Sequence, residues 1–508
     1  MPRAHLTLDP HFTVGRINRR IFGSFIEHLG RCVYDGIYEP GHPTADSNGF
    51  REDVIELVRE LGVSTIRYPG GNFVSGFRWE DSVGPRSERP TRLDLAWHST
   101  ETNEVGIDEF ALWLEKTGSE MMYAVNLGTR GVLEALDVLE YANIASGTAL
   151  SDARVQNGHP KPHAISMWCL GNEMDGPWQL GHTSAEDYGK LASQTAKAMR
   201  QLDPSVELVV CGSSSAHMPT FGAWEHTVLE HTYEDVDYIS CHAYYEEIDG
   251  DTASFLASAV DMDHFIESVV ATADAVRAQL GQTKKINISF DEWNVWYIRR
   301  YHSEDKITEI DSWPTAPRLL EDNYSVLDAV VFGNLMISLL KHAERVTSAS
   351  LAQLVNVIAP IMTEPGGDVW RQTTFYPFAL TSRLAVGDAL ELKLSSDTYE
   401  TTTYGEVPII DAVATHDDET GRTAIFLVNR SQRTASEITI DVSHLGTVSL
   451  LETHTLADDD IYATNTLVDQ TRVTPSPNES ASITDGVLTI TLPAVSWTAI
   501  SLGALPAA

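Results

Sequence analysis

Eight short apolar runs, each separated from the next by a stretch of helical periodicity, constrain the fold of this chain more than any other feature. Each run has strand character and is nearly continuous in apolar residues, which is typical of strands buried on both faces of a parallel sheet. The alternation of such strands with helices indicates βα units. The runs are Ile21–Ile26, Thr65–Tyr68, Met121–Asn126, Ile165–Leu170, Leu208–Cys211, Tyr238–Cys241, Ile286–Phe290 and Ser348–Gln353.

Eight βα units within residues 18–385 predict a closed (β/α)8 barrel, a TIM barrel. The helical patterns between the runs include Glu52–Leu61, Ile107–Thr117, Ser184–Gln201 and Tyr324–His342. A doubly wound open sheet is the alternative, but there the chemistry gathers at one glycine-rich turn. Here polar residues follow many strand ends, and this distribution favours the barrel.

The pattern changes after about residue 386. Segments that alternate or are rich in β-branched residues now follow one another, separated by acidic turns, which predicts an all-β sandwich of jelly-roll-like type. The strand-like residues 3–17 precede the barrel, and we expect them to complete this sandwich. We therefore predict a catalytic barrel over 18–385 and a β-sandwich domain from 1–17 and 386–508. The predicted sandwich strands include Glu391–Leu394, Thr423–Val428, Glu437–Val442 and Leu488–Leu492.

Charge and composition exclude several classes of partner. The formal net charge of the 508 residues is −37, which repels nucleic-acid phosphates and anionic membrane surfaces. No apolar stretch approaches the ~20 residues of a membrane span, and the N-terminus lacks the apolar run of a signal peptide. The four cysteines show no metal-type spacing and form no disulfide framework. We expect a reduced, cytoplasmic protein without a metal or cofactor.

Two glutamates follow two of the predicted strands. Glu173 comes just after Ile165–Leu170, and Glu292 comes just after Ile286–Phe290. On a barrel, the ends of the fourth and seventh strands can face each other across the mouth. Glycoside hydrolysis needs one carboxyl group to protonate the leaving oxygen and another to meet the anomeric carbon. Either glutamate alone could be a solvated loop carboxylate, but the two together predict a retaining glycosidase.

Longer motifs surround both glutamates. GNEMDGPWQLGH (171–182) and FDEWNVWY (290–297) resemble the α-L-arabinofuranosidases of glycoside hydrolase family 51. The resemblance extends to FGSFIEHLGRCVYDGIYEP from Phe22, RYPGGNFVSGFRWEDSVGP from Arg67, HAYY at His242 and ATNT at 463–466. It therefore covers nearly the whole chain. It implies a (β/α)8 barrel with a β-sandwich, a hexamer, no metal, and retaining exo-hydrolysis of terminal arabinofuranosyl residues in arabinan, arabinoxylan or arabino-oligosaccharides.

The resemblance also implies roles for single residues. Glu173 matches the acid/base and Glu292 the nucleophile, with Arg67 beside the nucleophile and His242 in support. Trp178 and Trp296 match apolar walls of the site, and Tyr244 matches a phenol that donates a hydrogen bond to the nucleophile. The residues matched to substrate binding are Glu27, Asn72, Asn172, Tyr244, Trp296 and Gln353.

Other interpretations stay open at this point. A retaining barrel glycosidase of endoglucanase or xylanase type would use the same two glutamates. A metal-dependent barrel hydrolase could use His28, His242 and Asp291, because barrel metal sites recruit strand-end His and Asp. A sugar-binding protein without activity is the third. Asp35 stands where the family pattern has glycine, and the loops Arg299–Asn323 and Met362–Arg371 are expected to border the mouth.

Overall fold

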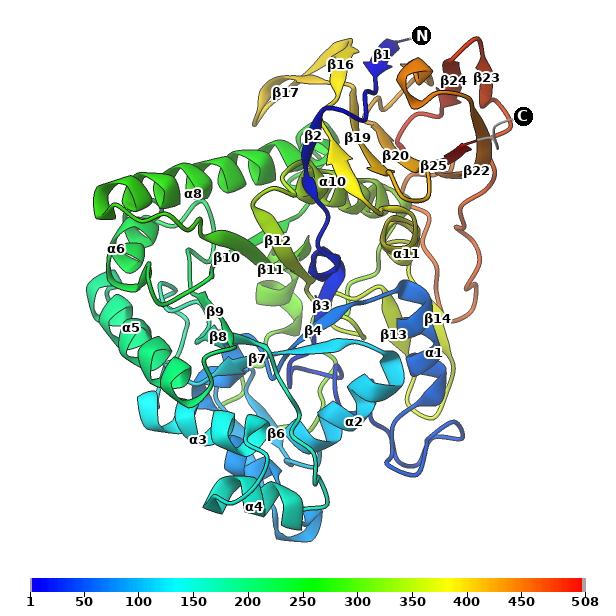
Figure 1. Cartoon of the computed structure of the whole chain (residues 1–508). Coiled ribbons are helices and arrows are strands. Elements are labelled where there is room, and N and C mark those ends of the chain that lie inside the picture. Colours follow the sequence, from blue (N-terminus) through cyan, green and yellow to red (C-terminus); the bar gives the residue numbers. More distant parts are fainter. Residues whose placement is uncertain (1, 505–508) are drawn as a thin grey trace.

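The barrel and the sandwich predicted from the sequence are both present in the computed structural model, which describes residues 2–504 (Figure 1). Eight parallel strands close into a barrel, with β12 hydrogen-bonded to β3 to complete the ring. In order around the barrel the strands are β3 (Gly23–Phe25), β4 (Thr65–Tyr68), β7 (Glu120–Val125), β8 (Met167–Leu170), β9 (Glu207–Val210), β10 (Tyr238–Tyr245), β11 (Asn287–Val295) and β12 (Val346–Leu351). The predicted fold class is therefore confirmed.

Two strand boundaries differ from the prediction in a way that matters for the site. β10 and β11 continue beyond Cys241 and Phe290, where their apolar runs end. They stay paired there, with His242 opposite Glu292 and Tyr244 opposite Asn294. Glu292 thus lies within a strand and not beyond its end. The apolar pattern missed these residues because their polar side chains face the barrel mouth. At the first strand, Arg19–Phe22 instead forms a 3-10 helix (η1).

The helices that cover the barrel follow the predicted patterns closely. α1 (Glu52–Leu61) and α2 (Ile107–Thr117) have the predicted bounds, and α5 (Ala185–Leu202) is shifted by one residue. α1 ends because Gly62 adopts φ 77° and its N–H caps the last carbonyls. The other long helices are α3 (Val132–Asn143), α4 (Ala149–Gln156), α6 (Ala223–Thr232), α8 (Ala259–Leu280), α10 (Val326–Lys341) and α11 (Phe375–Leu384).

The sandwich consists of two sheets, and the N-terminal segment joins both. β1 (Arg3–Thr7) lies in the order β16-β1-β21-β24-β23, and β2 (Thr13–Arg16) lies at the edge of β2-β15-β19-β20-β25-β22. Apolar side chains of the two sheets form a core between them. The remaining strands are β15 (Asp388–Leu390), β16 (Lys393–Ser396), β19 (Ile410–Asp417), β20 (Arg422–Asn429), β21 (Ser436–Asp441), β22 (Val448–Leu456), β23 (Ser482–Thr484), β24 (Val487–Leu492) and β25 (Ser496–Ala504).

The barrel and the sandwich pack closely against each other along α10. This helix is buried almost all round because it contacts the barrel on one side and β19, β20 and β25 on the other. A second contact is made by the hairpin of β17 (Thr398–Thr401) and β18 (Gly405–Pro408), which reaches the short helix α7 (Thr252–Leu256). There the Thr403 N–H donates to Ser254 Oγ at 3.1 Å. The sandwich thus extends to the rim of the barrel.

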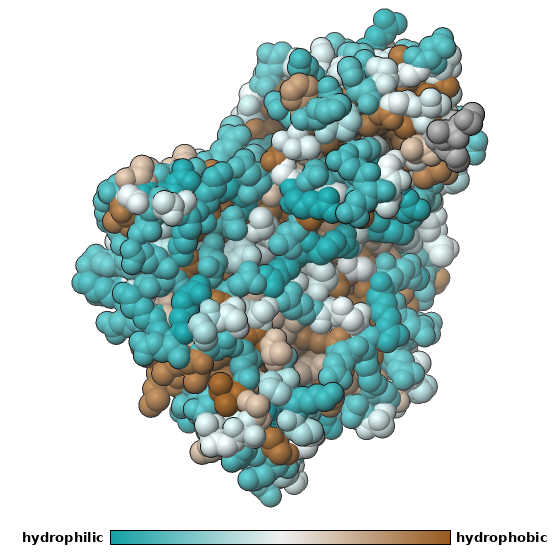
Figure 2. Space-filling model, viewed as in Figure 1, coloured by the Kyte–Doolittle hydropathy of each residue, from teal (hydrophilic) through white to brown (hydrophobic). Residues whose placement is uncertain are grey.

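Hydrophilic residues dominate the face of the molecule seen in Figure 2, with hydrophobic residues in small separate groups. This surface fits the net charge of −37. Among the helices of residues 2–504, none combines the length and the apolar character that crossing a bilayer requires.

A buried ion pair at the domain interface generates the first prediction. Arg430 donates to Asp411 at 2.9 Å and to Asn334, with the Arg430 side chain only 3% exposed. Although burial by itself raises the pKa of Asp411, the charges of Lys341 and Arg430 outweigh it and hold the pKa below its usual value. Arg430→Ala leaves this carboxylate short of a partner. It should lower the free energy of unfolding at neutral pH by about 3–5 kcal/mol, measured by urea denaturation.

The matched control is Arg3→Ala, because Arg3 forms a loose, exposed pair with Glu437 at 3.9 Å. Such surface pairs contribute little, so this variant should unfold like the unmodified protein. Equal stability of the two variants would contradict the importance given to the buried pair.

Candidate active site

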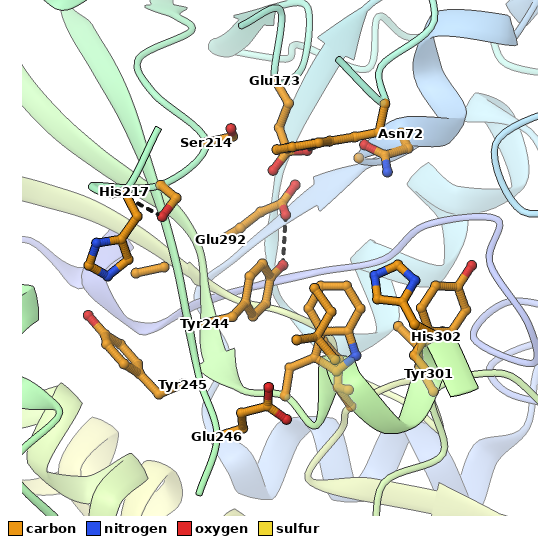
Figure 3. A pocket seen from close by; sticks show the side chains of 18 of the residues that line it. Asn72, Glu173, Ser214, His217, Tyr244, Tyr245, Glu246, Glu292, Tyr301 and His302 are labelled. Carbon is orange, nitrogen blue, oxygen red and sulfur yellow. Dashed lines mark hydrogen bonds between the residues drawn. The ribbon is translucent and has the colours of Figure 1, made fainter. Parts of the chain in front are cut away.

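One cavity of about 1600 Å³ opens at the C-terminal ends of the barrel strands, where barrel enzymes carry their chemistry. Its lining includes both glutamates singled out from the sequence, Glu173 and Glu292 (Figure 3). A carboxylate oxygen of each, together with a ring nitrogen of His242, lies within 4.8 Å of the others. The fold therefore brings together two carboxyl groups that are 119 residues apart in the chain.

Glu292 is held by two hydrogen bonds to its two oxygens. Arg67 Nη1 donates to Oε1 at 2.7 Å, and the Tyr244 hydroxyl donates to Oε2 at 2.7 Å. Arg67 also donates to Asn172 Oδ1 at 2.6 Å, which fixes its planar group. Burial raises the pKa of Tyr244 well above its usual value, so this phenol stays a donor. Charge-assisted bonds of this kind fix the orientation of the carboxylate.

Glu173 lies in the turn after β8 and has different neighbours. Its φ is +44°, a left-handed conformation uncommon for a residue with a side chain. His242 Nδ1 lies 2.8 Å from its Oε1, and the indole N–H of Trp178 donates to Oε2 at 2.6 Å. The Trp178 side chain is about half exposed, whereas His242 is buried. The two oxygens therefore differ, because Oε1 faces the protein interior and Oε2 faces the rim.

His242 connects Glu173 to a third buried carboxylate. Its Nε2 lies 2.9 Å from Asp291 Oδ1, and Asp291 is 1% exposed. Although burial alone lowers the pKa of His242, the charges of Glu292, Asp291 and Glu173 outweigh it and raise the pKa well above its usual value. The arrangement Asp291–His242–Glu173 is therefore a chain of charge-assisted hydrogen bonds.

Glu27 forms the opposite wall of the cavity. The Phe73 N–H and the Trp97 indole N–H donate to its Oε1 at 2.8 and 2.9 Å, and Gln353 Nε2 donates to Oε2 at 3.1 Å. Burial raises the pKa of Glu27 to about 8. A Cβ at Gly71 would lie 2.7 Å from Glu27 Oε2. The Gly70-Gly71 pair thus does more than form a turn, because it lets the chain pass against this carboxyl group.

The structure brings all of the candidate site residues together. Asn172 Nδ2 donates to Asn72 Oδ1 at 3.3 Å, and the rings of Trp296 and Tyr244 meet edge to face. Arg67, Asn172 and His242 are buried below the surface of the cavity and are bonded to residues that line it. The candidates that line it directly are Glu27, Asn72, Glu173, Trp178, Tyr244, Glu292, Trp296 and Gln353.

Sequence reasoning missed several residues of the site. Trp97 reaches Glu27 from a hairpin, β5 (Arg92–Asp94) and β6 (Ser99–Glu101), inserted between β4 and α2. No motif marks it, because its place depends on how this insertion folds back. Tyr301 and His302 come from the rim loop Arg299–Asn323, which was expected to border the mouth.

The loop Met362–Arg371, expected to border the mouth, contributes no residue to the lining of the cavity, and Asp35 does not line it either. Asp35 has φ +60°. That value explains why glycine suits this position, since the left-handed region favours it.

The residues weighed for a metal site do not form one set of ligands. The ring nitrogens of His28 lie 2.8 Å from Glu101 Oε2 and 2.9 Å from the Tyr68 hydroxyl, while His242 and Asp291 contact each other. Among residues 2–504, the side chains spaced closely enough for an ion are Glu173, His242 and Glu292. This set is the two glutamates of the candidate active site together with His242.

Comparisons with known proteins agree over both domains. Residues 57–254 match the model of the α-L-arabinofuranosidase 1 domain, and residues 291–496 match that of the α-L-arabinofuranosidase C-terminal domain. An exo-α-(1→6)-L-arabinofuranosidase of Bifidobacterium longum is 61% identical over 98% of this chain and 97% of its own. An intracellular exo-α-(1→5)-L-arabinofuranosidase of Streptomyces lividans is 59% identical, over 98% of this chain and 75% of its own.

Solved structures give the same answer. A family 51 α-L-arabinofuranosidase from Bifidobacterium longum superimposes with a TM-score of 0.95 and 52% identity, covering 99% of each chain. Sequence, fold and the residues of the cavity thus agree. The chain belongs to the α-L-arabinofuranosidases of glycoside hydrolase family 51.

Proposed function

We propose that this protein is a retaining, exo-acting α-L-arabinofuranosidase that releases terminal arabinofuranosyl residues from arabinan, arabinoxylan or arabino-oligosaccharides. The approach of the Glu173 and Glu292 carboxylates, with oxygens within 4.8 Å, carries the proposal. Carboxyl groups of retaining pairs lie about 5–5.5 Å apart, whereas inverting pairs lie about 6.5–9.5 Å apart to admit a water. The activity named for the relatives in Bifidobacterium longum and Streptomyces lividans supports the choice of sugar.

In the first step Glu292 attacks the anomeric carbon as the nucleophile. Arg67 and Tyr244 hold its carboxylate in place. As the glycosidic bond breaks, Glu173 gives its proton to the leaving oxygen, and an ester joins the sugar to Glu292. In the second step Glu173 takes a proton from water, the hydroxide oxygen attacks the anomeric carbon, and the ester bond breaks. Two inversions give net retention.

The remaining cavity residues are assigned to substrate binding. Glu27, Asn72 and Gln353 line the cavity and present carboxylate and amide groups that can hydrogen-bond the hydroxyls of one sugar. Asn172, assigned the same role by the family resemblance, lies just below the cavity surface and donates to Asn72. Trp296 supplies an apolar wall. Trp178 has a second task beside forming a wall, because its N–H holds the acid/base Glu173. An apolar wall facing a small set of carboxylate and amide groups suits the binding of one terminal sugar residue, and exo action requires such binding.

A panel of nitrophenyl glycosides tests the activity. The value of kcat/KM should be highest on the α-L-arabinofuranoside. The competing endoglucanase or xylanase function would instead give its highest value on a pyranoside. The names of the relatives include 1→5 and 1→6 linkages, so arabinobioses of both linkages complete the panel.

The roles of the two glutamates can be separated by leaving-group chemistry. Glu173→Ala should nearly spare the first step on a dinitrophenyl arabinofuranoside, which needs little protonation. On natural glycosides it should lose the ~10²–10⁴-fold typical of a general acid. Azide, which needs no deprotonation, should restore turnover and give an arabinosyl azide of the substrate's anomeric configuration, identified by proton NMR.

Glu292→Ala is the matched variant. It removes the nucleophile, so activity should fall equally on substrates with good and with poor leaving groups. Mass spectrometry should detect no covalent adduct. An exchange of behaviour between the two variants would reverse the assignment.

Asp291 gives a pH-dependent prediction. The charged groups that act on His242 are Glu173, Asp175, Asp291 and Glu292, and Arg67 lies 3.8 Å from Asp291 Oδ2, the oxygen that His242 does not contact. Asp291→Asn removes one negative charge and should lower the pKa of His242. His242, which is hydrogen-bonded to Glu173, would then lose its proton at lower pH. The basic limb of kcat/KM should therefore move to lower pH by about 1–3 units.

Asp35→Asn is the control for this change, because Asp35 does not line the cavity. Its pH profile should match that of the unmodified enzyme. A loss of rate in Asp291→Asn without movement of the basic limb would mean that Asp291 only supports the fold.

Location and assembly are proposed on the same basis. A cytoplasmic location is supported by the Streptomyces lividans relative, which is named intracellular. A homo-oligomer, a hexamer by family resemblance, is the proposed assembly, and light scattering coupled to size-exclusion chromatography measures it.

A further inference from the structure

The catalytic cavity continues past the two glutamates toward the β-sandwich. Its volume of about 1600 Å³ exceeds the ~300–1,000 Å³ of ordinary ligand pockets. Its lining includes Thr402, Thr403 and Tyr404, which form the turn of the β17–β18 hairpin. Since the site proposed for the terminal sugar uses only barrel residues, these sandwich residues lie in a part of the cavity to which the reaction itself assigns no role.

The order of strands around the barrel indicates which part of the substrate would bind in the part of the cavity near residues 402–404. The residues proposed to bind the terminal sugar come largely from one side, with Glu27 after β3, Asn72 after β4 and Gln353 after β12. Glu173 follows β8 on the other side, and the loops after β9 and β10 come next around the barrel. A general acid must contact the leaving oxygen. The leaving group therefore points toward β9 and β10.

Figure 3 shows the same division. His217 and Tyr245 lie on one side of Tyr244, while Asn72, Tyr301 and His302 lie on the other. His217 comes from the loop after β9, and Tyr245 ends β10. We name the region lined by 214–217, Tyr245, Asp261 and 402–404 the sandwich-side branch.

The chemistry of the sandwich-side branch suits sugar hydroxyls. The Tyr245 hydroxyl donates to Asp261 Oδ2 at 3.1 Å, and His217 Nε2 lies 3.8 Å from Asp261 Oδ1. A carboxylate offers about four acceptor positions, so Asp261 keeps capacity for further donors. The half-buried Tyr404 lines the same cavity as Asp261, and burial and the charge of Asp261 raise the pKa of this phenol. An acceptor beside an aromatic ring can hold both the hydroxyls and the apolar face of a sugar.

We propose that the sandwich-side branch binds the sugar chain on the leaving-group side of the cleaved bond, with Asp261 accepting hydrogen bonds from its hydroxyls and Tyr404 packing against a ring. This inference rests on the proposed glycosidase function. It gives the β-sandwich a direct part in choosing the substrate. A small leaving group such as nitrophenol carries no sugar hydroxyls for Asp261 to bind.

The test compares substrates of increasing length. We would measure kcat and KM for α-1,5-linked arabino-oligosaccharides of two to six units and for nitrophenyl arabinofuranoside. In the unmodified enzyme kcat/KM should rise with length. Asp261→Asn and Tyr404→Ala should each lower kcat/KM on the longest substrate by about tenfold or more, mainly through KM, as expected for lost bonds to a charged group. On the nitrophenyl substrate both should stay within about twofold of the unmodified enzyme, well below that loss.

Tyr462→Ala is the matched control, because Tyr462 is an exposed sandwich tyrosine that does not line the cavity. It should behave like the unmodified enzyme on every substrate. Thermal melting of each variant checks that the hairpin change leaves the fold intact.

Three results would overturn the inference. The first is that kcat/KM does not rise with length, and the second is that both variants keep full activity on the longest substrate. The third is a parallel loss on the nitrophenyl and long substrates, which would place the effect at the catalytic centre. Failure of the unmodified enzyme to cleave nitrophenyl arabinofuranoside would instead overturn the proposed function itself.

Discussion

The guanidinium of Arg67 lies buried among Glu292, Asn172 and Asp291, and the arrangement of the barrel mouth depends on this contact. Removing charges from water costs several kcal/mol per ion even after relaxation. Consecutive residues of β11 supply two buried carboxylates, and Glu173 adds a third nearby. Arg67 from below and His242 from the neighbouring strand offset these charges. The buried carboxylates are tolerated because the buried side chains of Arg67 and His242 lie next to them.

The same balance fits the division of roles proposed for the two glutamates. Glu292 has both oxygens occupied by donors that stay with it, whereas Glu173 Oε2 is held only by the half-exposed Trp178. A nucleophile benefits from a fixed position, while an acid/base must exchange protons with substrate and water. Asp291 and His242 act on the buried oxygen of Glu173 and leave the other free to react. The different partners of the two glutamates thus support the different roles proposed for them.

The barrel strands and helices were predictable because their burial imposes a regular pattern of apolar residues on the sequence. The position of Glu173 followed from the same pattern, since a polar turn interrupts an apolar run there. The extension of β10 and β11 did not, because polar side chains at the mouth carry no strand pattern. Trp97 was missed because an inserted hairpin folds back over Glu27. Asp291 was weighed only as a metal ligand, since its contact with His242 depends on strand register.

The pairing of β1 with β21 has a consequence for how the protein is made. Residues 3–7 leave the ribosome well before their partners in the parallel ladder, residues 437–441. Contacts this distant in sequence form slowly, and domains otherwise tend to fold as they emerge. β1 therefore has neither of its neighbouring strands until β16 and then β21 have been synthesised. Meanwhile α10 lacks the sandwich strands that cover it. Between the synthesis of α10 and that of β25, the apolar face of α10 that the sandwich strands cover stays exposed.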